Sequence, residues 1–101
     1  MDAEKRKRYE NIAAELTRLA GGRNNILGIA HCATRLRLVL EDNDKADIHA
    51  LEDVDLVKGV FVAGDQLQII FGAGLVNDVW QVLADSLHMD RMSLGDLKTK
   101  G

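Results

Sequence analysis

The chain of 101 residues contains no proline, a single cysteine, and aromatic residues at only 4% of its positions. Without proline, helices and strands are not interrupted, and turns depend on glycine, asparagine and aspartate. One cysteine excludes an intrachain disulfide and a zinc site built from several cysteines, and a lone thiol is typical of a reducing compartment. Because aromatic residues are scarce, leucine, isoleucine, valine and alanine must form most of the core.

The sequence also lacks an excess of positive charge, and it lacks any hydrophobic run near the roughly 20 residues that span a bilayer. Sixteen acidic and 13 basic side chains give a net charge of −3, so a general nucleic-acid footprint is not expected. No apolar stretch follows the charged N-terminus, and a secretory signal is therefore not expected. With 47% hydrophobic and 29% charged residues, the composition is that of one small folded domain.

Charge is spread unevenly along the chain. Residues 24–40 include Arg35 and Arg37 but no acid, whereas residues 41–55 include seven acids and one lysine. An acid-free segment inside an acidic protein is a place where an anion could bind. Two buried strands would also exclude acids, so composition alone leaves both interpretations open.

The hydrophobic pattern predicts three helices and four strands, because apolar residues recur at three- and four-residue spacing in some segments and alternate in others. The predicted helices cover residues 4–20, 45–52 and 75–88, and the predicted strands cover residues 26–30, 35–40, 56–62 and 66–71. Asn43 and Asp44 are the expected caps of the middle helix. The order α-β-β-α-β-β-α predicts an α+β fold in which a four-stranded, mainly antiparallel sheet carries three helices on one face.

The segment from His31 to Arg37 reads His-Cys-Ala-Thr-Arg-Leu-Arg and carries most of the chemistry. Cys32 is a nucleophile at a strand-to-strand turn, where backbone N–H groups converge and can hold an anion. Arg35 and Arg37 project to one face and match phosphate oxygens, and Thr34 adds a hydroxyl donor. Amide and cationic surroundings lower the pKa of a thiol below its usual value of about 8.5. The pattern indicates a cysteine that carries a phosphoryl group; the alternative is a small core residue.

This string, with Asn25-Ile26 before it and Asp42 after it, resembles the phosphocysteine signature of glucose–sucrose-type EIIB domains of the sugar phosphotransferase system. Residues 57–60 and 64–72 look like the second half of the same family, and the resemblance runs over residues 10–87. The resemblance implies the same α+β sandwich. It implies neither a cofactor nor a metal ion, since the protein's own donors would meet the phosphate.

The resemblance implies that the chain is a protein-phosphocysteine–sugar phosphotransferase. Cys32 would take a phosphoryl group from a phosphohistidine of an EIIA partner and give it to a sugar held by a membrane-embedded EIIC partner. Backbone amides at residues 33–35, those of Ala33, Thr34 and Arg35, and the Thr34 hydroxyl would hold the phosphate. Arg35 and Arg37 would stabilise the charge as the group leaves. His31 is a further candidate, as a donor to the phosphate or as the base that deprotonates the thiol.

The flanking residues look most like sucrose-type members, with N-acetylmuramic acid, trehalose and β-glucoside members as alternatives. Because the periodicity fades from Met89 onward, residues 1–90 are the expected carrier domain and residues 91–101 a flexible tether leading to EIIC. The expected location is the cytoplasmic face of the bacterial inner membrane, without a nucleic-acid partner. The alternative function is a non-enzymatic regulatory module that binds a ligand or a partner, since small antiparallel sandwiches often serve that way.

Overall fold

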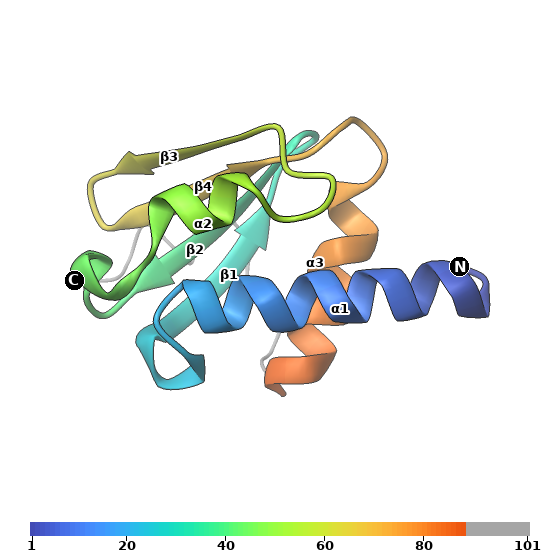
Figure 1. Ribbon diagram of the computed structural model, residues 1–101, viewed down its shortest axis with the longest axis horizontal. Coiled ribbons are helices and arrows are strands. Elements are labelled where there is room, and N and C mark those ends of the chain that lie inside the picture. Colours follow the sequence, from blue (N-terminus) through green and yellow to red (C-terminus); the bar gives the residue numbers. More distant parts are fainter. Residues whose placement is uncertain (89–101) are drawn as a thin grey trace.

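The computed structural model describes residues 1–88, which form three helices and a four-stranded antiparallel sheet (Figure 1). The elements are α1 (Ala3–Leu19), η1 (Arg23–Asn25), β1 (Ile26–His31), β2 (Arg35–Leu40), η2 (Asn43–Lys45), α2 (Ile48–Glu52), β3 (Gly59–Ala63), β4 (Gln66–Ile70) and α3 (Val76–Leu87), where η marks a 3-10 turn. The predicted fold class and order are confirmed. The expected tether at residues 91–101 lies outside the described residues, and within those residues no helix meets the length and hydropathy of a membrane span.

The sheet has the strand order β1-β2-β4-β3, so β2 and β4 are its inner strands. In this register Arg37 of β2 lies opposite Ala30 of β1 on one side and Gln68 of β4 on the other, and Gln68 in turn lies opposite Phe61 of β3. Side chains at directly paired positions project to the same face of a sheet. These four residues therefore form one row across all four strands.

The core lies between the helices and one face of the sheet. Leu36, Leu38 and Leu40 of β2 are at most 1% exposed and belong to one cluster with the inward residues of α1 and α3. Val39 and Ala30, on the opposite face, form a separate small cluster. The alternation of β2 therefore separates a helical face from a second face, called the polar face below, which carries Arg35, Arg37, Gln66, Gln68 and Phe61.

Two predicted boundaries are wrong. The middle helix begins at Ile48 rather than at residue 45, because the Asp47 carboxylate, not that of Asp44, accepts the capping hydrogen bond from Ala50 N–H at 3.1 Å. Asn43 and Asp44 instead form η2, which Asp42 caps. The third strand begins at Gly59 rather than at residue 56, and the chain before it turns with a positive φ of 70° at Leu56.

Buried Asn25 joins the end of α1 to the two strands that carry the predicted site. Its amide nitrogen donates to the carbonyl oxygens of Ala20 and Asp42 at 2.7 and 2.9 Å, and its amide oxygen accepts from Asp42 N–H at 2.9 Å. Gly21, at φ 101°, lies so close that a Cβ there would stand 2.6 Å from the Asn25 amide nitrogen. The side chain of Asn25 is therefore buried and hydrogen-bonded through both atoms of its amide.

Replacing Asn25 by alanine should lower the free energy of unfolding by about 2 kcal/mol, because it leaves several backbone groups without their hydrogen-bond partner. The exposed neighbour Asn24 supplies the matched control, and Asn24→Ala should change stability by less than about 0.5 kcal/mol. Urea denaturation followed by circular dichroism measures both. Equal effects of the two substitutions would contradict the structural role assigned to Asn25.

Candidate functional site

Residues 32–34, called the Cys32 loop below, join β1 to β2 at one end of the sheet. The Cys32 N–H donates to the Arg35 carbonyl oxygen at 3.0 Å, which closes the turn of the hairpin. The Phe71 N–H, just beyond β4, donates to the Thr34 carbonyl oxygen at 2.8 Å. The loop is thus held by its own hairpin and by the neighbouring strand, while Ala33 and Thr34 remain exposed at its tip.

The partly buried Sγ of Cys32 is the point on which the loop's donors converge. The backbone N–H of Thr34 makes the largest contribution to a lowered pKa of this thiol, and the N–H of Arg35 adds to it. Partial burial opposes the shift, and the Arg37 guanidinium, with Nη2 3.9 Å from Sγ, lowers the pKa further. All of these donors stabilise the thiolate, so the geometry favours the nucleophilic form of the cysteine.

Arg37 presents one edge of its guanidinium next to the sulfur, and Nη2 on that edge lies 3.9 Å from Sγ. Its Nη1 donates to the Gln66 side-chain oxygen at 3.4 Å, whereas its buried Nε has no hydrogen-bond acceptor within residues 1–88. Nε and Nη2 form the guanidinium edge that binds two oxygens of one carboxylate or phosphate side by side. Since Nη2 already lies near Sγ, this edge is placed to receive the oxygens of a group bound to Cys32.

Arg35 lies on the same polar face but has different partners. Its Nη1 donates to the Gln68 side-chain oxygen at 2.8 Å, and its guanidinium carbon stands 5.7 Å from the centre of the exposed Phe61 ring. A cation over an aromatic face is weakly attracted to it, so Gln68 and Phe61 together orient this side chain. Of the two predicted arginines, the structure brings Arg37 to the sulfur and turns Arg35 towards the neighbouring strands.

Gln66 and Gln68 are not among the residues predicted for the site, although both contact its arginines. Gln68 is 7% exposed, and its amide nitrogen lies 3.5 Å from the Gln66 oxygen, so the two glutamines and the two arginines form one chain of contacts. The signal was present in the alternation of polar and apolar residues along strand β4. Two glutamines on the same face as two arginines indicate that the arginines have partners there.

His31 does not face the sulfur. Its imidazole ring centre lies 4.7 Å from that of Trp80 on α3, and Nδ1 lies 3.1 Å from the carbonyl oxygen of Cys32. In the register of the hairpin His31 is opposite the buried Leu36, so it belongs to the helical face. This geometry does not favour His31 as the base that removes the thiol proton.

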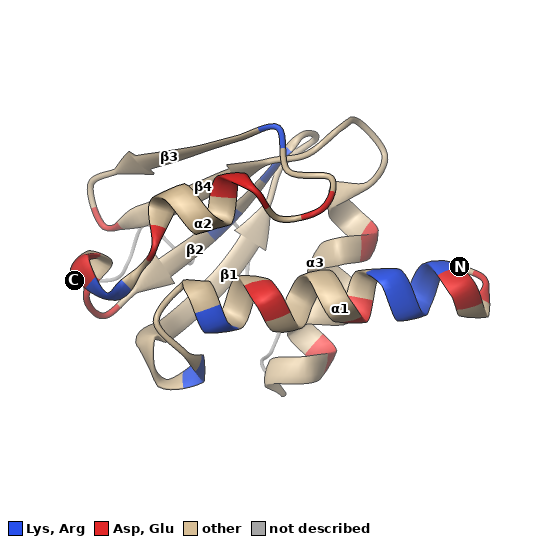
Figure 2. Cartoon of the chain, viewed as in Figure 1, with Lys and Arg blue, Asp and Glu red and all other residues tan. Residues whose placement is uncertain are grey.

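Charge is segregated along the sheet, as Figure 2 shows. Arg35, Arg37 and Lys58 lie towards the end that carries the Cys32 loop, where the Lys58 N–H donates to the Ile70 carbonyl oxygen at 2.8 Å. At the opposite end an acidic group follows β2 and includes the β3–β4 turn, where Asn43 donates to the Gly64 carbonyl oxygen at 2.9 Å. The acids of that end are Glu41, Asp42, Asp44 and Asp65. The two arginines of the acid-free segment therefore lie towards the cationic end of the sheet.

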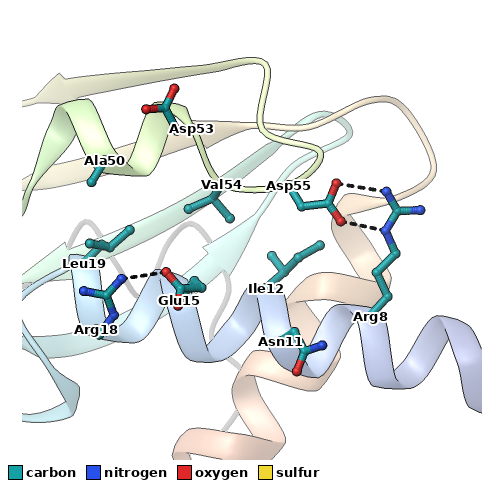
Figure 3. Close-up of a pocket in the computed structure, with 10 residues that line it drawn as sticks. All are labelled: Arg8, Asn11, Ile12, Glu15, Arg18, Leu19, Ala50, Asp53, Val54 and Asp55. Carbon is teal, nitrogen blue, oxygen red and sulfur yellow. Dashed lines mark hydrogen bonds and ion pairs between the residues drawn. The ribbon is translucent and has the colours of Figure 1, made fainter.

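A separate pocket of about 420 Å³ lies between α1 and the segment around α2 (Figure 3). Ile12, Leu19 and Val54 line it, and the ion pair of Arg8 with Asp55, at 2.7 Å, stands at one end. None of its lining residues belongs to the Cys32 loop or to the polar face. Within residues 1–88 no cluster of three histidine, cysteine or acidic side chains is arranged to hold a metal ion.

Alkylation by iodoacetamide measures the state of the Cys32 thiol, because only the thiolate reacts and the chain has one cysteine. Since the pKa is lowered, the rate should reach half its plateau at a lower pH in the folded chain than in the chain unfolded in urea. Arg37→Met should raise this midpoint, because it removes a nearby positive charge. Arg35→Met is the matched control and should raise it less; the opposite order would contradict the geometry.

Comparison with known proteins identifies the family of the chain. The family described as phosphotransferase system, EIIB, matches residues 14–47. Sucrose-specific EIIBC components from Vibrio alginolyticus and Klebsiella pneumoniae are 45% and 53% identical over 92% and 84% of this chain, which spans only 19% of either relative. The crystal structure of one domain of the PTS system IIabc component from Clostridium difficile has a TM-score of 0.80 and 40% identity over 87% of this chain and 90% of that one. The chain therefore belongs to the EIIB family of the phosphotransferase system.

Proposed function

We propose that the chain carries a phosphoryl group on Cys32, taking it from a phosphohistidine of an EIIA partner and giving it to a sugar bound by a membrane EIIC partner. The observation that carries the proposal is the surroundings of Sγ. Two backbone amides and the guanidinium edge of Arg37 converge on a partly buried thiol whose pKa is lowered. This set of donors fits both a thiolate and the phosphate that would replace its proton.

In the first step the Sγ thiolate attacks the phosphorus atom of the phosphohistidine. The new S–P bond forms as the N–P bond breaks, and the imidazole nitrogen keeps the electron pair of the broken bond and takes a proton from solvent. The amides of Thr34 and Arg35 and the edge of Arg37 stabilise the charge on the transferring oxygens. The lowered pKa of Cys32 provides the thiolate without a neighbouring base.

In the second step a hydroxyl oxygen of the sugar attacks the same phosphorus atom. The O–P bond forms, the S–P bond breaks, Sγ leaves as the thiolate, and the hydroxyl proton passes to solvent. The same donors that lower the thiol pKa make Cys32 a good leaving group, because they stabilise its anion. Arg35 lies farther out on the polar face, between Gln68 and Phe61, where it can meet the departing phosphate.

The names of the relatives favour sucrose as the sugar. In those relatives the matched part is about a fifth of the protein, and their names join the B part to a C component. We propose that residues 1–90 are the carrier domain, that residues 91–101 lead to an EIIC domain, and that the carrier works at the cytoplasmic face of the membrane. The sugar would then be selected by EIIC, the component that would hold it during transfer.

Incubating the chain with EIIA that has been phosphorylated with ³²P should label Cys32, with the acid–base stability of a thiophosphate. Cys32→Ser is the control and should take up less than about a hundredth of the label, because a serine hydroxyl remains protonated near neutral pH. Label that persists in the serine variant would sink the proposal. A stable complex with a partner and no label would favour the regulatory alternative.

Arg37→Met and Arg35→Met should slow transfer from labelled Cys32 to the sugar at least tenfold, since each removes a charge that stabilises the leaving group or the phosphate. Membrane vesicles containing EIIC and ¹⁴C-sucrose measure this step, and β-glucosides and trehalose serve as comparison sugars. Labelling by EIIA should survive in Arg35→Met, whose guanidinium does not contact Sγ in the structure. Loss of both steps to the same extent in Arg35→Met contradicts the separate roles.

A further inference from the structure

The side chain of His31 binds the backbone of the Cys32 loop from the helical face. Its Nδ1 lies 3.1 Å from the carbonyl oxygen of Cys32. A carbonyl oxygen only accepts hydrogen bonds, so Nδ1 must carry a hydrogen and donate it. This holds for the Nδ1-protonated neutral ring and for the imidazolium, so the contact does not depend on whether Nε2 is protonated.

The carbonyl of Cys32 and the N–H of Ala33 belong to one rigid peptide plane. The direction of that carbonyl therefore sets the direction in which the chain enters the loop. The next two N–H groups along the chain are those of Thr34 and Arg35, which are directed at Sγ. Because these two amides follow the Cys32–Ala33 plane in the chain, the orientation of that plane helps to determine where they point relative to Sγ.

The ring of His31 is itself held by the core. Its centre is 4.7 Å from that of Trp80, with the two planes tilted by 55°, and Trp80 is 8% exposed on the inward side of α3. A tilted aromatic pair at this separation is mutually stabilising. The imidazole therefore lies between a fixed aromatic ring and the loop, and its Nδ1 position follows from the packing of α3 on the sheet.

We propose that His31 is a positioning residue, which through its Nδ1–H bond to the Cys32 carbonyl holds the loop in the conformation where the Thr34 and Arg35 amides face Sγ. It touches neither the sulfur nor a transferred group, and it acts through the backbone alone. This role differs from both chemical roles considered for it from the sequence, since neither a donor to phosphate nor a base for the thiol uses the Cys32 carbonyl.

Two substitutions separate the hydrogen bond from the ring packing. His31→Phe keeps an aromatic ring against Trp80 and removes the donor. His31→Asn removes the ring but retains an N–H donor on the atom attached to Cγ, which is the place of Nδ1 in histidine. The readout is the pH midpoint of Cys32 alkylation by iodoacetamide in the otherwise unchanged chain, together with the thermal midpoint of unfolding for each variant.

His31→Phe should raise the alkylation midpoint by about half a pH unit, which at a pH below the midpoint is roughly a threefold slower reaction. Its thermal midpoint should stay close to that of the unchanged chain. His31→Asn should bring the alkylation midpoint back towards the original value, even where loss of the ring lowers thermal stability. This crossed pattern would not arise from a role in stability alone.

A His31→Phe chain with an unchanged alkylation midpoint overturns the proposal, and so does a His31→Asn chain whose midpoint is raised as far as that of His31→Phe. Arg37 is the charged group that contacts Sγ, and it is the same in all three chains. The experiment involves no phosphoryl transfer. Its result therefore stands apart from the labelling of Cys32 by EIIA, and failure of one is distinguishable from failure of the other.

Discussion

The site depends on the pairing of β2 between β1 and β4. The hydrogen bonds that fix the Cys32 loop continue the two ladders of this strand, from Cys32 to Arg35 on one side and from Phe71 to Thr34 on the other. A shift of β2 by one residue would exchange its two faces, because side chains alternate along a strand. The arginines would then enter the core and the leucines would leave it. The buried leucines of β2 thus stabilise the fold and also keep the arginines on the face that carries the site.

The sequence predicted most of the fold because its periodicities are strong. The alternation in residues 35–40 predicted β2 with its observed bounds, and the apolar stripe of residues 75–88 predicted α3 to within one residue at each end. The errors arose where tertiary contacts determine the residue at which an element begins. Leu56 turns the chain with positive φ before β3, and Asp47 rather than Asp44 meets the free amides of α2. The spacing of hydrophobic residues predicts neither the turn at Leu56 nor the cap at Asp47.

The sequence predicted which residues make up the candidate site, but it predicted less well how their side chains are arranged. Strand parity correctly placed Arg35 and Arg37 on one face, but parity cannot tell which guanidinium reaches the sulfur. The orientation of His31 follows from Trp80, which lies 49 positions later in the chain and meets it only after α3 has packed. Pairings of this kind join residues far apart in sequence. Local sequence patterns therefore predict which residues belong to the site, but they do not predict which of these residues contact one another.

The segregation of charge along the sheet also makes the sheet an electric dipole. Its positive end is the end with the Cys32 loop, and its negative end is the acidic group beyond β2 and at the β3–β4 turn. In the field of a negatively charged molecule such a dipole turns before contact, so that approach with the sulfur foremost becomes more frequent than chance would allow. Screening weakens this torque beyond about 10 Å at 0.1 M salt. The arrangement of charges therefore selects the orientation of encounter as well as the chemistry that follows it.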